Sequence, residues 1–367
     1  MKLPRIHIKG LKILDRYIIG KFLGTYVFAI VLILAITVMF DINEKLDAFL
    51  KAPLKETVFD YFVNFLPYFA NQFSPLFTFI AVIFFTSKLA DNSEIIAMLS
   101  TGMSYRRLLM PYMLSAAVIA AATFVLSAYV IPPANVKRIA YQNTYVKNKA
   151  VNYGSNIQLQ VSPGVIAYMN RYDNTNKTGY RFSLEKFDGK KLMSRMTAQT
   201  IHYDTLYNWT VRDYMIRDFK GTREVITRGT RLDTVIAIEP RDFLIAKNDQ
   251  EMLTSPALSE YIARQKARGV ANIKNFEIEY HRRYAITAAA FILTVIGMAL
   301  SSRKVKGGMG INIGIGLVLS FSYILFMTVT STFAVSGYTS PMVAMWIPNI
   351  IYAIIAVLLY RRVSTAA

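Results

Sequence analysis

The stretch FLGTYVFAIVLILAITVMF, residues 22–40, decides the fold class of this 367-residue chain. It carries no charged side chain, and its length is close to the ~20 residues that a helix needs to cross a ~30 Å hydrocarbon core. The run is too long for a signal peptide, and no small-residue cleavage site precedes the charged segment at 41–47. We therefore expect a membrane-spanning helix here.

Five further windows share this length and apolarity. The chain is 54% hydrophobic, with a mean hydropathy of +0.32, yet it contains 42 Lys and Arg residues, so apolar and charged residues must be segregated along it. The windows are 62–85, 108–131, 284–300, 311–334 and 342–360. Together with the first window they predict an α-helical membrane protein with six transmembrane helices.

Basic residues in the short connecting segments predict the orientation. Six Lys and Arg residues precede the first span and only Asp15 opposes them, which places the N-terminus in the cytoplasm. The other basic short segments fall on the same side, with Lys88, Arg106 and Arg107 after the second span, Arg303, Lys304 and Lys306 after the fourth, and Arg361 and Arg362 after the sixth. Both termini are therefore expected in the cytoplasm, and the long segment 132–275 on the opposite side.

The chain thus divides into three parts: spans one to three at 1–131, an inserted domain at 132–275, and spans four to six at 276–367. The inserted domain contains 23 Lys and Arg against 13 Asp and Glu. Long translocated domains do not obey the positive-inside rule, so topology does not explain this excess. It indicates either an anionic ligand or an ordinary basic surface. With the charge distributed in this way, the formal net charge of +19 favours a membrane over nucleic acid as the partner.

Alternating short segments between Ile157 and Ile245 predict β-structure in the inserted domain. Asp188-Gly189 marks a hairpin turn, so we expect an antiparallel, jelly-roll-like sandwich or open barrel of about eight strands. A helix at 256–269 should lead back to the fourth span. Phe182 and Leu184 are candidates to hold a fatty acyl chain on the apolar face of the sheet, although a β-domain buries such residues simply to fold.

Several kinds of chemistry are excluded. The chain has no Cys, and its three His residues, His7, His202 and His281, are not at metal-ligand spacing, so no metal site is expected. The sequence at 307–310 lacks the Lys of a phosphate-binding loop. No GxSxG motif and no pair of acids within a span supports a hydrolase or a proton relay. No catalytic residue and no cofactor is predicted.

Two spans carry unusual residues. Span two contains Pro67, Asn71, Gln72 and Pro75, which predict a kinked helix that faces protein or a cavity. Span five opens with glycines at 310, 314 and 316, which permit close helix contact.

A polar segment between spans two and three predicts a short amphipathic helix at about 91–101, on the cytoplasmic side. Asp91 and Glu94 supply acids at its start, while Ile95 and Met98 share one face. A helix that floats at the lipid interface usually carries Lys and Arg on its polar side. The acids therefore favour a protein partner over the lipid interface.

Several segments, in order, resemble the LptF/LptG permease family of lipopolysaccharide exporters over nearly the whole chain. The most specific is Ser93-Glu94-Ile95-Ile96-Ala97-Met98 followed by Gly102, which is similar to the family's coupling helix. The others are Leu14-Asp15-Arg16-Tyr17-Ile18, the region 198–209, Glu279-Tyr280-His281-Arg282-Arg283, and Trp346 with Asn349 and Tyr352. The first of these resembles LptG and the last resembles LptF, so the paralogue stays open.

The resemblance implies a subunit of an ABC transporter in the bacterial inner membrane, with the inserted domain in the periplasm. Its implied partners are a paralogous LptF/LptG permease, a dimer of the cytoplasmic ATPase LptB, and periplasmic bridge proteins like LptC and LptA. Glu94 would dock in a groove of the ATPase, with Asp91, Ile95 and Met98 beside it. Spans one and five would line the lateral opening through which lipopolysaccharide enters.

Basic residues near the outer end of span one meet lipid phosphates in this family, but Asp47 and Ala48 depart from the local pattern. Lys45, Lys51, Lys137 and Arg138 are the candidates here, as phosphate contacts or as interfacial anchors. A different class, a mechanotransmission protein of the FtsX or MacB type, usually has four spans. A polytopic membrane enzyme would need intramembrane acids or His.

Overall fold

The computed structural model describes residues 12–146, 153–221, 223–240, 249–267, 273–303 and 309–365. Contacts divide the chain into two compact units. The helical unit comprises residues 1–146, 251–256 and 277–367, and the β unit comprises residues 147–250 and 257–276.

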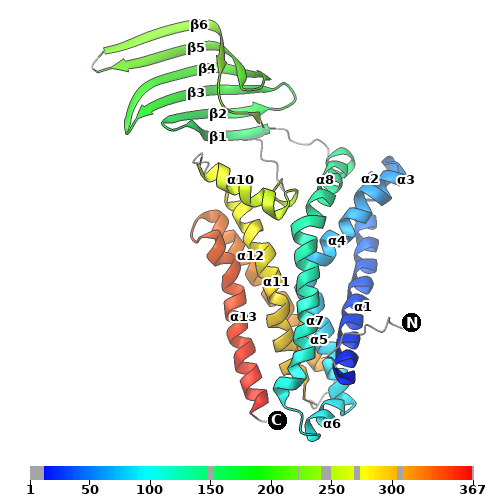
Figure 1. Ribbon diagram of the computed structural model, residues 1–367. Coiled ribbons are helices and arrows are strands. Elements are labelled where there is room, and N and C mark those ends of the chain that lie inside the picture. The colour runs from blue at the N-terminus through cyan, green and yellow to red at the C-terminus, as the bar shows by residue number, and fades with distance from the viewer. Residues whose placement is uncertain are drawn as a thin grey trace. The chain divides into compact units, whose positions relative to one another are not determined.

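Six helices in the described part of the chain are long and apolar enough to cross a membrane, which confirms the predicted number of spans. They are α1 (Ile13–Glu44), α5 (Ser74–Asp91), α7 (Tyr105–Val125), α11 (Lys274–Ser301), α12 (Met309–Ser336) and α13 (Pro341–Ser364). The third continues through η2 (Leu126–Val130), α8 (Ile131–Tyr141) and η3 (Gln142–Val146). Figure 1 shows α7 running on into α8, with α1 beside it.

The second span is broken, as its prolines predict. It consists of α4 (Val63–Gln72) and α5, which meet at Phe73. Pro67 lies inside α4 and Pro75 in the first turn of α5. Lost backbone hydrogen bonds are tolerated where protein, not lipid, surrounds them. Accordingly, α5 is the most buried of the six spans and α1 the most exposed. The short elements α2 (Leu46–Lys51), α3 (Leu54–Glu56) and η1 (Thr57–Phe62) precede α4.

One glycine of α12 allows a close approach to α5. A Cβ atom at Gly316 would lie 2.2 Å from Cδ1 of Ile83, so a larger residue there would require the end of this Ile side chain to move. Open space surrounds the Cβ positions of Gly310 and Gly314. The close helix contact predicted for this motif therefore forms at Gly316 within this chain.

Buried polar side chains hold the spans together. Asn349 of α13 donates to the carbonyl oxygen of Ala285 in α11 at 2.9 Å and accepts from Tyr323 of α12 at 2.8 Å. Asn312 of α12 donates to the hydroxyl of Ser87 in α5 at 3.2 Å. Such groups need partners within the protein because lipid offers none. These bonds fix the register of the four helices.

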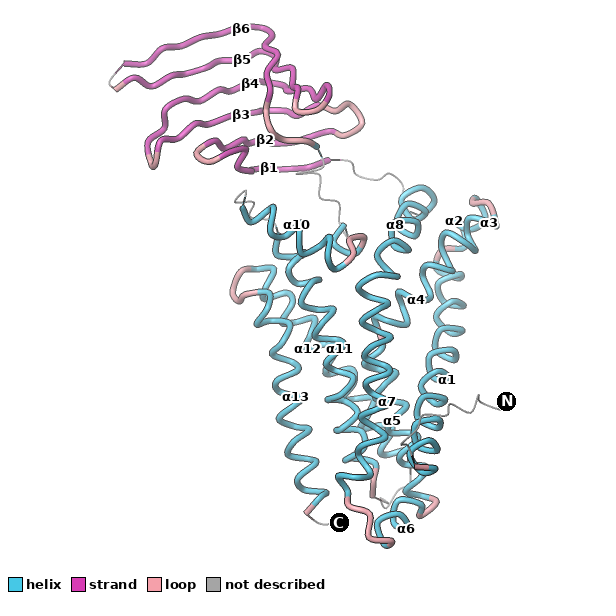
Figure 2. Tube along the Cα trace, in the orientation of Figure 1, coloured by secondary structure: helices cyan, strands magenta, loops and turns pink. Residues whose placement is uncertain are grey.

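The β unit contains an antiparallel sheet of six strands in the order β1 to β6, visible in Figure 2. The strands are β1 (Tyr153–Ser162), β2 (Val165–Asp173), β3 (Thr178–Asp188), β4 (Lys191–Thr205), β5 (Asn208–Lys220) and β6 (Arg223–Val235). The Asp188-Gly189 turn joins β3 to β4, as predicted, and Gly189 has a φ of 58°. A short 3-10 helix, η4 (Asp249–Glu251), and α10 (Ser255–Ala267) follow the sheet, so the predicted helix before span four is present.

The inserted antiparallel β-domain is confirmed, with a different strand count. About eight strands were expected in a sandwich or open barrel, but the described residues form six in one sequential sheet. Fewer strands form because the strands are longer than expected, and β4 alone runs for 15 residues. One face is apolar and contains Phe182, Ala198 and Ile201, all buried. The indole of Trp209 closes this core and donates to the carbonyl oxygen of Ile238 at 3.1 Å.

Candidate functional site

A seven-residue helix, α6 (Glu94–Ser100), connects α5 to α7 where the amphipathic helix was predicted. Ile95 and Met98 are buried in the core of the helical unit, whereas the side chain of Ile96 is 58% exposed. Asp91, expected at the start of this helix, is instead the last residue of α5. The inward pair anchors α6 on the bundle and leaves its opposite face open.

Glu94 is held at the start of α6 by two neutral donors. Its Oε2 accepts from the hydroxyl of Tyr17 in α1 at 3.0 Å, and its Oε1 accepts from the side-chain amide of Asn92 at 3.1 Å. Ser93, between Asn92 and Glu94, adopts a left-handed backbone with a φ of 61°. A turn of this kind ends α5 abruptly and directs α6 back toward α1. The carboxylate is thus oriented and partly exposed, and no cation pairs with it in the described part of the chain.

Next to this contact, Asp15 of α1 and Arg107 of α7 form a bidentate ion pair. Arg107 donates from Nη1 to Oδ1 at 2.8 Å and from Nη2 to Oδ2 at 2.7 Å. The Asp15 side chain is 5% exposed and that of Arg107 30%. Asp15 also accepts from the backbone N–H of Lys12, which caps the start of α1. Sequence reasoning assigned both residues to charge balance across the membrane and missed that they pair.

Lys45, predicted to contact lipid phosphate, has partners within the chain. Its ammonium group pairs with Asp41 and donates to the hydroxyl of Tyr61 at 2.7 Å. It also lies 5.9 Å from the ring centre of Phe65. A cluster of aromatic rings from α2, η1, α4 and α8 surrounds this point. Lys51 and Lys137, by contrast, are exposed.

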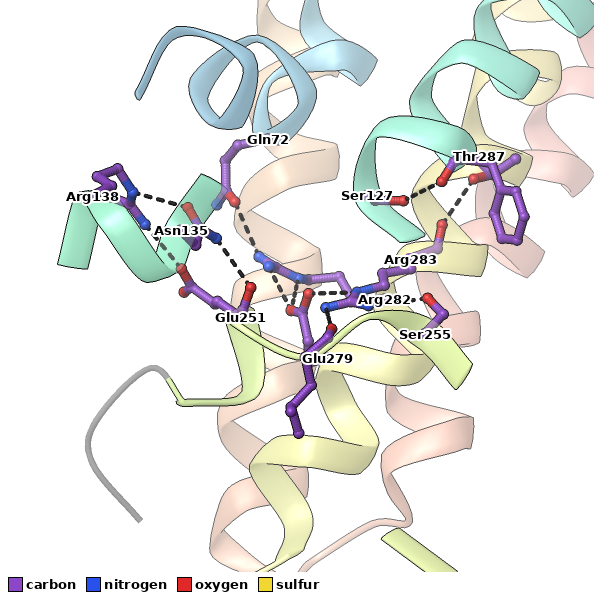
Figure 3. A network of polar contacts seen from close by, with 12 residues as sticks. Gln72, Ser127, Asn135, Arg138, Glu251, Ser255, Glu279, Arg282, Arg283 and Thr287 are labelled. Carbon is purple, nitrogen blue, oxygen red and sulfur yellow. Dashed lines mark hydrogen bonds and ion pairs between the residues drawn. The ribbon is translucent and has the colours of Figure 1, made fainter. Parts of the chain in front are cut away.

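Arg138, the other predicted lipid contact with internal partners, belongs to a buried polar network (Figure 3). It donates to Asn135 at 2.9 Å and pairs with Glu251 at 3.2 Å. Its guanidinium lies 4.0 Å from the ring centre of Tyr68. Arg138 is 6% exposed. It therefore ties α8 to α4 and to the segment at 251–256, which belongs to the helical unit.

Two adjacent arginines of α11 complete this network. Arg283 donates to Glu279 at 3.0 Å, to the hydroxyl of Ser255 at 3.0 Å and to the carbonyl oxygen of Leu253 at 2.9 Å. Arg282 pairs with the same Glu279 at 2.6 Å and donates to Gln72 of α4 at 3.2 Å. Figure 3 shows Glu279 between the two guanidinium groups. The network joins α4, α8, α11 and the 251–256 segment through buried, charge-assisted hydrogen bonds.

A small cavity of about 30 Å³ lies inside the network, lined by Tyr68, Asn71, Gln72, Glu251 and Glu279 among others. That volume holds roughly one or two water molecules. The Oδ1 atom of Asn71 is buried there and has no hydrogen-bond donor among the residues that the structure describes. Burial and the nearby charge of Glu279 raise the pKa of Glu251, although Arg282 and Arg138 oppose the shift.

The β unit carries a larger, open hollow of about 510 Å³. Arg181, Arg195 and Arg228 contribute to its lining, together with Phe182 and Tyr214. Phe182 is 1% exposed, and Leu184, two residues further along β3, packs against the same apolar cluster without lining the hollow. The hollow thus combines apolar contacts with guanidinium groups.

Within the described ranges, no group of three or more His, Asp or Glu residues has a geometry that suits a metal ion. The sequence analysis did not predict the contacts of the following residues: Asp15, Tyr17 and Arg107 at one end of the helical unit, and Glu251, Glu279, Arg282 and Arg283 in the network. One signal was available for the network, because Glu279, Arg282 and Arg283 stand at i, i+3 and i+4 on one helix face.

Comparison with known families gives one match. The family model described as "Lipopolysaccharide export system permease LptF/LptG" matches residues 16–362. A search of curated proteins gave no significant match. The matched range begins within α1 and ends within α13, so it includes all six spans, α6 and the sheet. The chain belongs to the LptF/LptG family of lipopolysaccharide export permeases, which are transport subunits.

Proposed function

We propose that this chain is the permease subunit of an ABC exporter that extracts lipopolysaccharide from the bacterial inner membrane, with ATP hydrolysed by a separate subunit. The family match supplies the substrate class. The observation that carries the ATPase connection is α6, which is anchored inward by Ile95 and Met98 and carries the partly exposed Glu94 as its first residue. A separate ATPase needs a contact of this kind, because it changes the bundle only through differential contacts with its states.

The orientation follows from charge. We infer that α6 and both ends of the chain face the cytoplasm, where Lys88, Arg106, Arg361 and Arg362 satisfy the positive-inside rule. The β unit would then lie in the periplasm.

On this proposal, the residues of the coupling segment divide their roles. Glu94, with Asp91 and the exposed Ile96, would face the ATPase. Ile95 and Met98 would transmit force because they are fixed in the core. A carboxylate suits a docking contact, since a cation from the partner forms a charge-assisted hydrogen bond with it.

The remaining partners follow from the family's transport role. We propose a paralogous LptF/LptG permease in the membrane, a cytoplasmic LptB ATPase dimer below, and periplasmic proteins like LptC and LptA that accept the lipid. Apolar side chains on α1 and α12 support contact with lipid or a second permease, since Phe28, Val31 and Phe321 are each more than half exposed.

The lipid would meet two kinds of surface. Lys51 and Lys137 are exposed cations available to lipid phosphate, whereas Lys45 and Arg138 must first leave Asp41 and Glu251. In the β unit, the arginine-lined hollow offers sites for phosphate or carboxylate groups. Acyl chains would follow the apolar face of the sheet, where Phe182 and Leu184 lie.

Co-purification tests the proposal. The complex would be purified on a tag carried by this chain as Glu94→Ala, as Glu94→Lys, and as Glu44→Lys, a control at an exposed acid on the opposite end of α1. We expect both Glu94 variants to recover less ATPase, with the greater loss for Lys, while the control recovers all of it. Full recovery and normal lipid export in both Glu94 variants would refute the docking role.

Reporter fusions test the orientation independently. We expect a fusion at Ser340 to report the periplasm and one at Thr365 the cytoplasm, since an odd number of spans precedes Ser340 and an even number precedes Thr365. The opposite pattern would reverse the orientation and place α6 away from any cytoplasmic ATPase.

A further inference from the structure

Glu94 of α6 and Arg107 of α7 are both bonded to α1, the span with the smallest buried share. Because most of α1 is not buried within this chain, its polar contacts to neighbouring helices are the features that can fix its orientation. Two of these lie at its first turns, within three residues of each other. They are the Asp15–Arg107 ion pair and the Tyr17–Glu94 hydrogen bond.

We propose that Asp15, Tyr17 and Arg107 are positioning residues that join α1 to the α6–α7 connection, so that α1 and α6 move as one body when the ATPase moves α6. This inference rests on the proposed function. It assigns the route by which movement at α6 reaches the bundle: through α1, by way of two side-chain contacts.

The ion pair is the stronger contact. Arg107 presents two parallel N–H groups to both carboxylate oxygens of Asp15, a geometry that fixes direction as well as distance. Asp15 is almost fully buried, so separating the pair would leave its charge uncompensated. Since Arg107 lies in the first turn of α7, three residues after its N-cap Ser104, the contact fixes the end of the α6–α7 connection to α1.

The Tyr17 contact is weaker and orients Glu94 without occupying it. A carboxylate has about four acceptor sites on its two oxygens, and Tyr17 and Asn92 use one on each oxygen. Two sites therefore remain for a cation of the ATPase. Tyr17 can hold Glu94 while the partner binds, which is what a rigid link between α1 and α6 requires.

The packing of α1 would allow this helix to move when α6 moves. α1 packs against α5 and α7, and a hydrogen bond between the hydroxyls of Tyr26 and Ser74, at 3.0 Å, joins it to α5 further along. Most of α1 is nevertheless not buried within this chain, and segments with little burial rearrange at lower cost than packed cores. A displacement at the first turns of α1 would thus tilt the helix, and α1 is a span that the proposed function places at the lipid entrance.

The test uses the whole permease pair with its ATPase in liposomes that contain lipopolysaccharide. Tyr17→Phe removes only a hydroxyl, and Arg107→Lys keeps the charge but loses the bidentate fork. Tyr338→Phe and Arg106→Lys are matched controls, because both residues are exposed. We expect both test variants to retain the ATPase, while lipid released per ATP hydrolysed falls about threefold or more, within the range seen for coupling mutations.

A distance measurement separates this role from a merely structural one. The chain has no Cys, so pairs of spin labels can be placed freely. Labels at Val31 and Ser100 suit this purpose, since both are exposed and Val31 lies about 21 Å along α1 from Tyr17 at 1.5 Å per residue. We expect one narrow distance that persists with and without ATP in the unaltered chain, and a broadened distribution in Tyr17→Phe and Arg107→Lys.

The outcomes distinguish the two proposals. If Glu94→Lys loses the ATPase but Tyr17→Phe and Arg107→Lys keep normal release per ATP and a narrow label distance, the link through α1 is wrong and the proposed function stands. If Glu94→Lys retains the ATPase in full, the docking role fails and the link through α1 fails with it.

Discussion

The two ends of the helical unit are held together in different ways. At the α6 end, one ion pair and one hydrogen bond join α1 to its neighbours, and Arg107 and Glu94 are both partly exposed. At the opposite end, three arginines and two glutamates form a network in which Arg138 and Arg283 are almost fully buried. At the α6 end a partner can reach the partly exposed Glu94 while its bond to Tyr17 persists, whereas the network at the opposite end is dry and its charges satisfy one another. We therefore expect the α6 end to move and the network end to stay fixed.

The largest expected effect on stability comes from removing the Arg283 side chain at the network end. Arg283→Ala would leave Glu279 with one partner fewer and Leu253 and Ser255 without their donor. Breaking a buried pair in this way costs about 3–5 kcal/mol. We expect a marked fall in the melting temperature of the purified protein. Arg264→Ala, at an exposed pair with Glu260, is the control and should change the stability by less than about 1 kcal/mol. Equal effects of the two would mean that the network is not an anchor.

The next effect concerns the ion pair at the α6 end. Asp15→Asn keeps the shape of the side chain but removes the charge that Arg107 pairs with. Because Arg107 is 30% exposed, water can solvate it after the change. We expect a loss of about 1.5–3 kcal/mol, the range for a hydrogen bond to a charged group, and smaller than for Arg283→Ala. Thermal unfolding of the two variants in one detergent gives the comparison. A larger loss for Asp15→Asn would reverse the assignment of the fixed and movable ends.

Hydropathy and charge predicted the spans because lipid imposes a uniform rule on every residue of a spanning helix. Pro67 and Pro75 likewise predicted a kink in the second span, because a missing backbone donor acts locally, although its position at Phe73 was not predicted. Neither the network nor the Asp15–Arg107 pair could be predicted in the same way. The network joins Gln72 to Arg282, 210 positions apart, and periodicity carries no information on which distant charges meet.

Prediction of the candidate site was limited in the same way, because local sequence features do not reveal distant partners. Glu94 was proposed as a docking residue because its motif and its acidity are local features of the sequence. Lys45 and Arg138 were selected for their height in the membrane, a criterion that ignores Asp41 and Glu251 as competing partners. In the β unit, alternation placed Phe182 and Leu184 on one face correctly, but the depth of burial depends on how neighbouring strands pack.

A pH dependence follows from Glu251 at the network end. Its folded-state pKa is raised by burial and by the charge of Glu279. The folded state therefore binds a proton more tightly than the unfolded state, and Glu251 lowers the stability as the pH rises from the ordinary Glu pKa through the raised one. We expect Glu251→Gln to flatten this decline when the melting temperature is measured from acid to neutral pH. A steeper decline in the variant would show that the pairing with Arg138 outweighs burial.

The smallest effect on stability, and the one that sharpens the comparison most, belongs to Tyr17→Phe. The hydrogen bond from Tyr17 to Glu94 is exposed, and its loss leaves no buried group without a partner, so we expect a change in stability of no more than about 0.5–1.5 kcal/mol, the net worth of one hydrogen bond. The melting temperature should therefore stay close to that of the unaltered protein while lipid release per ATP falls. A residue at the fixed end cannot show this combination, because removal of any network member acts first on stability. If Tyr17→Phe lowered stability and release together in proportion, the α6 end would be an anchor like the other, and the functional difference between the two ends would disappear.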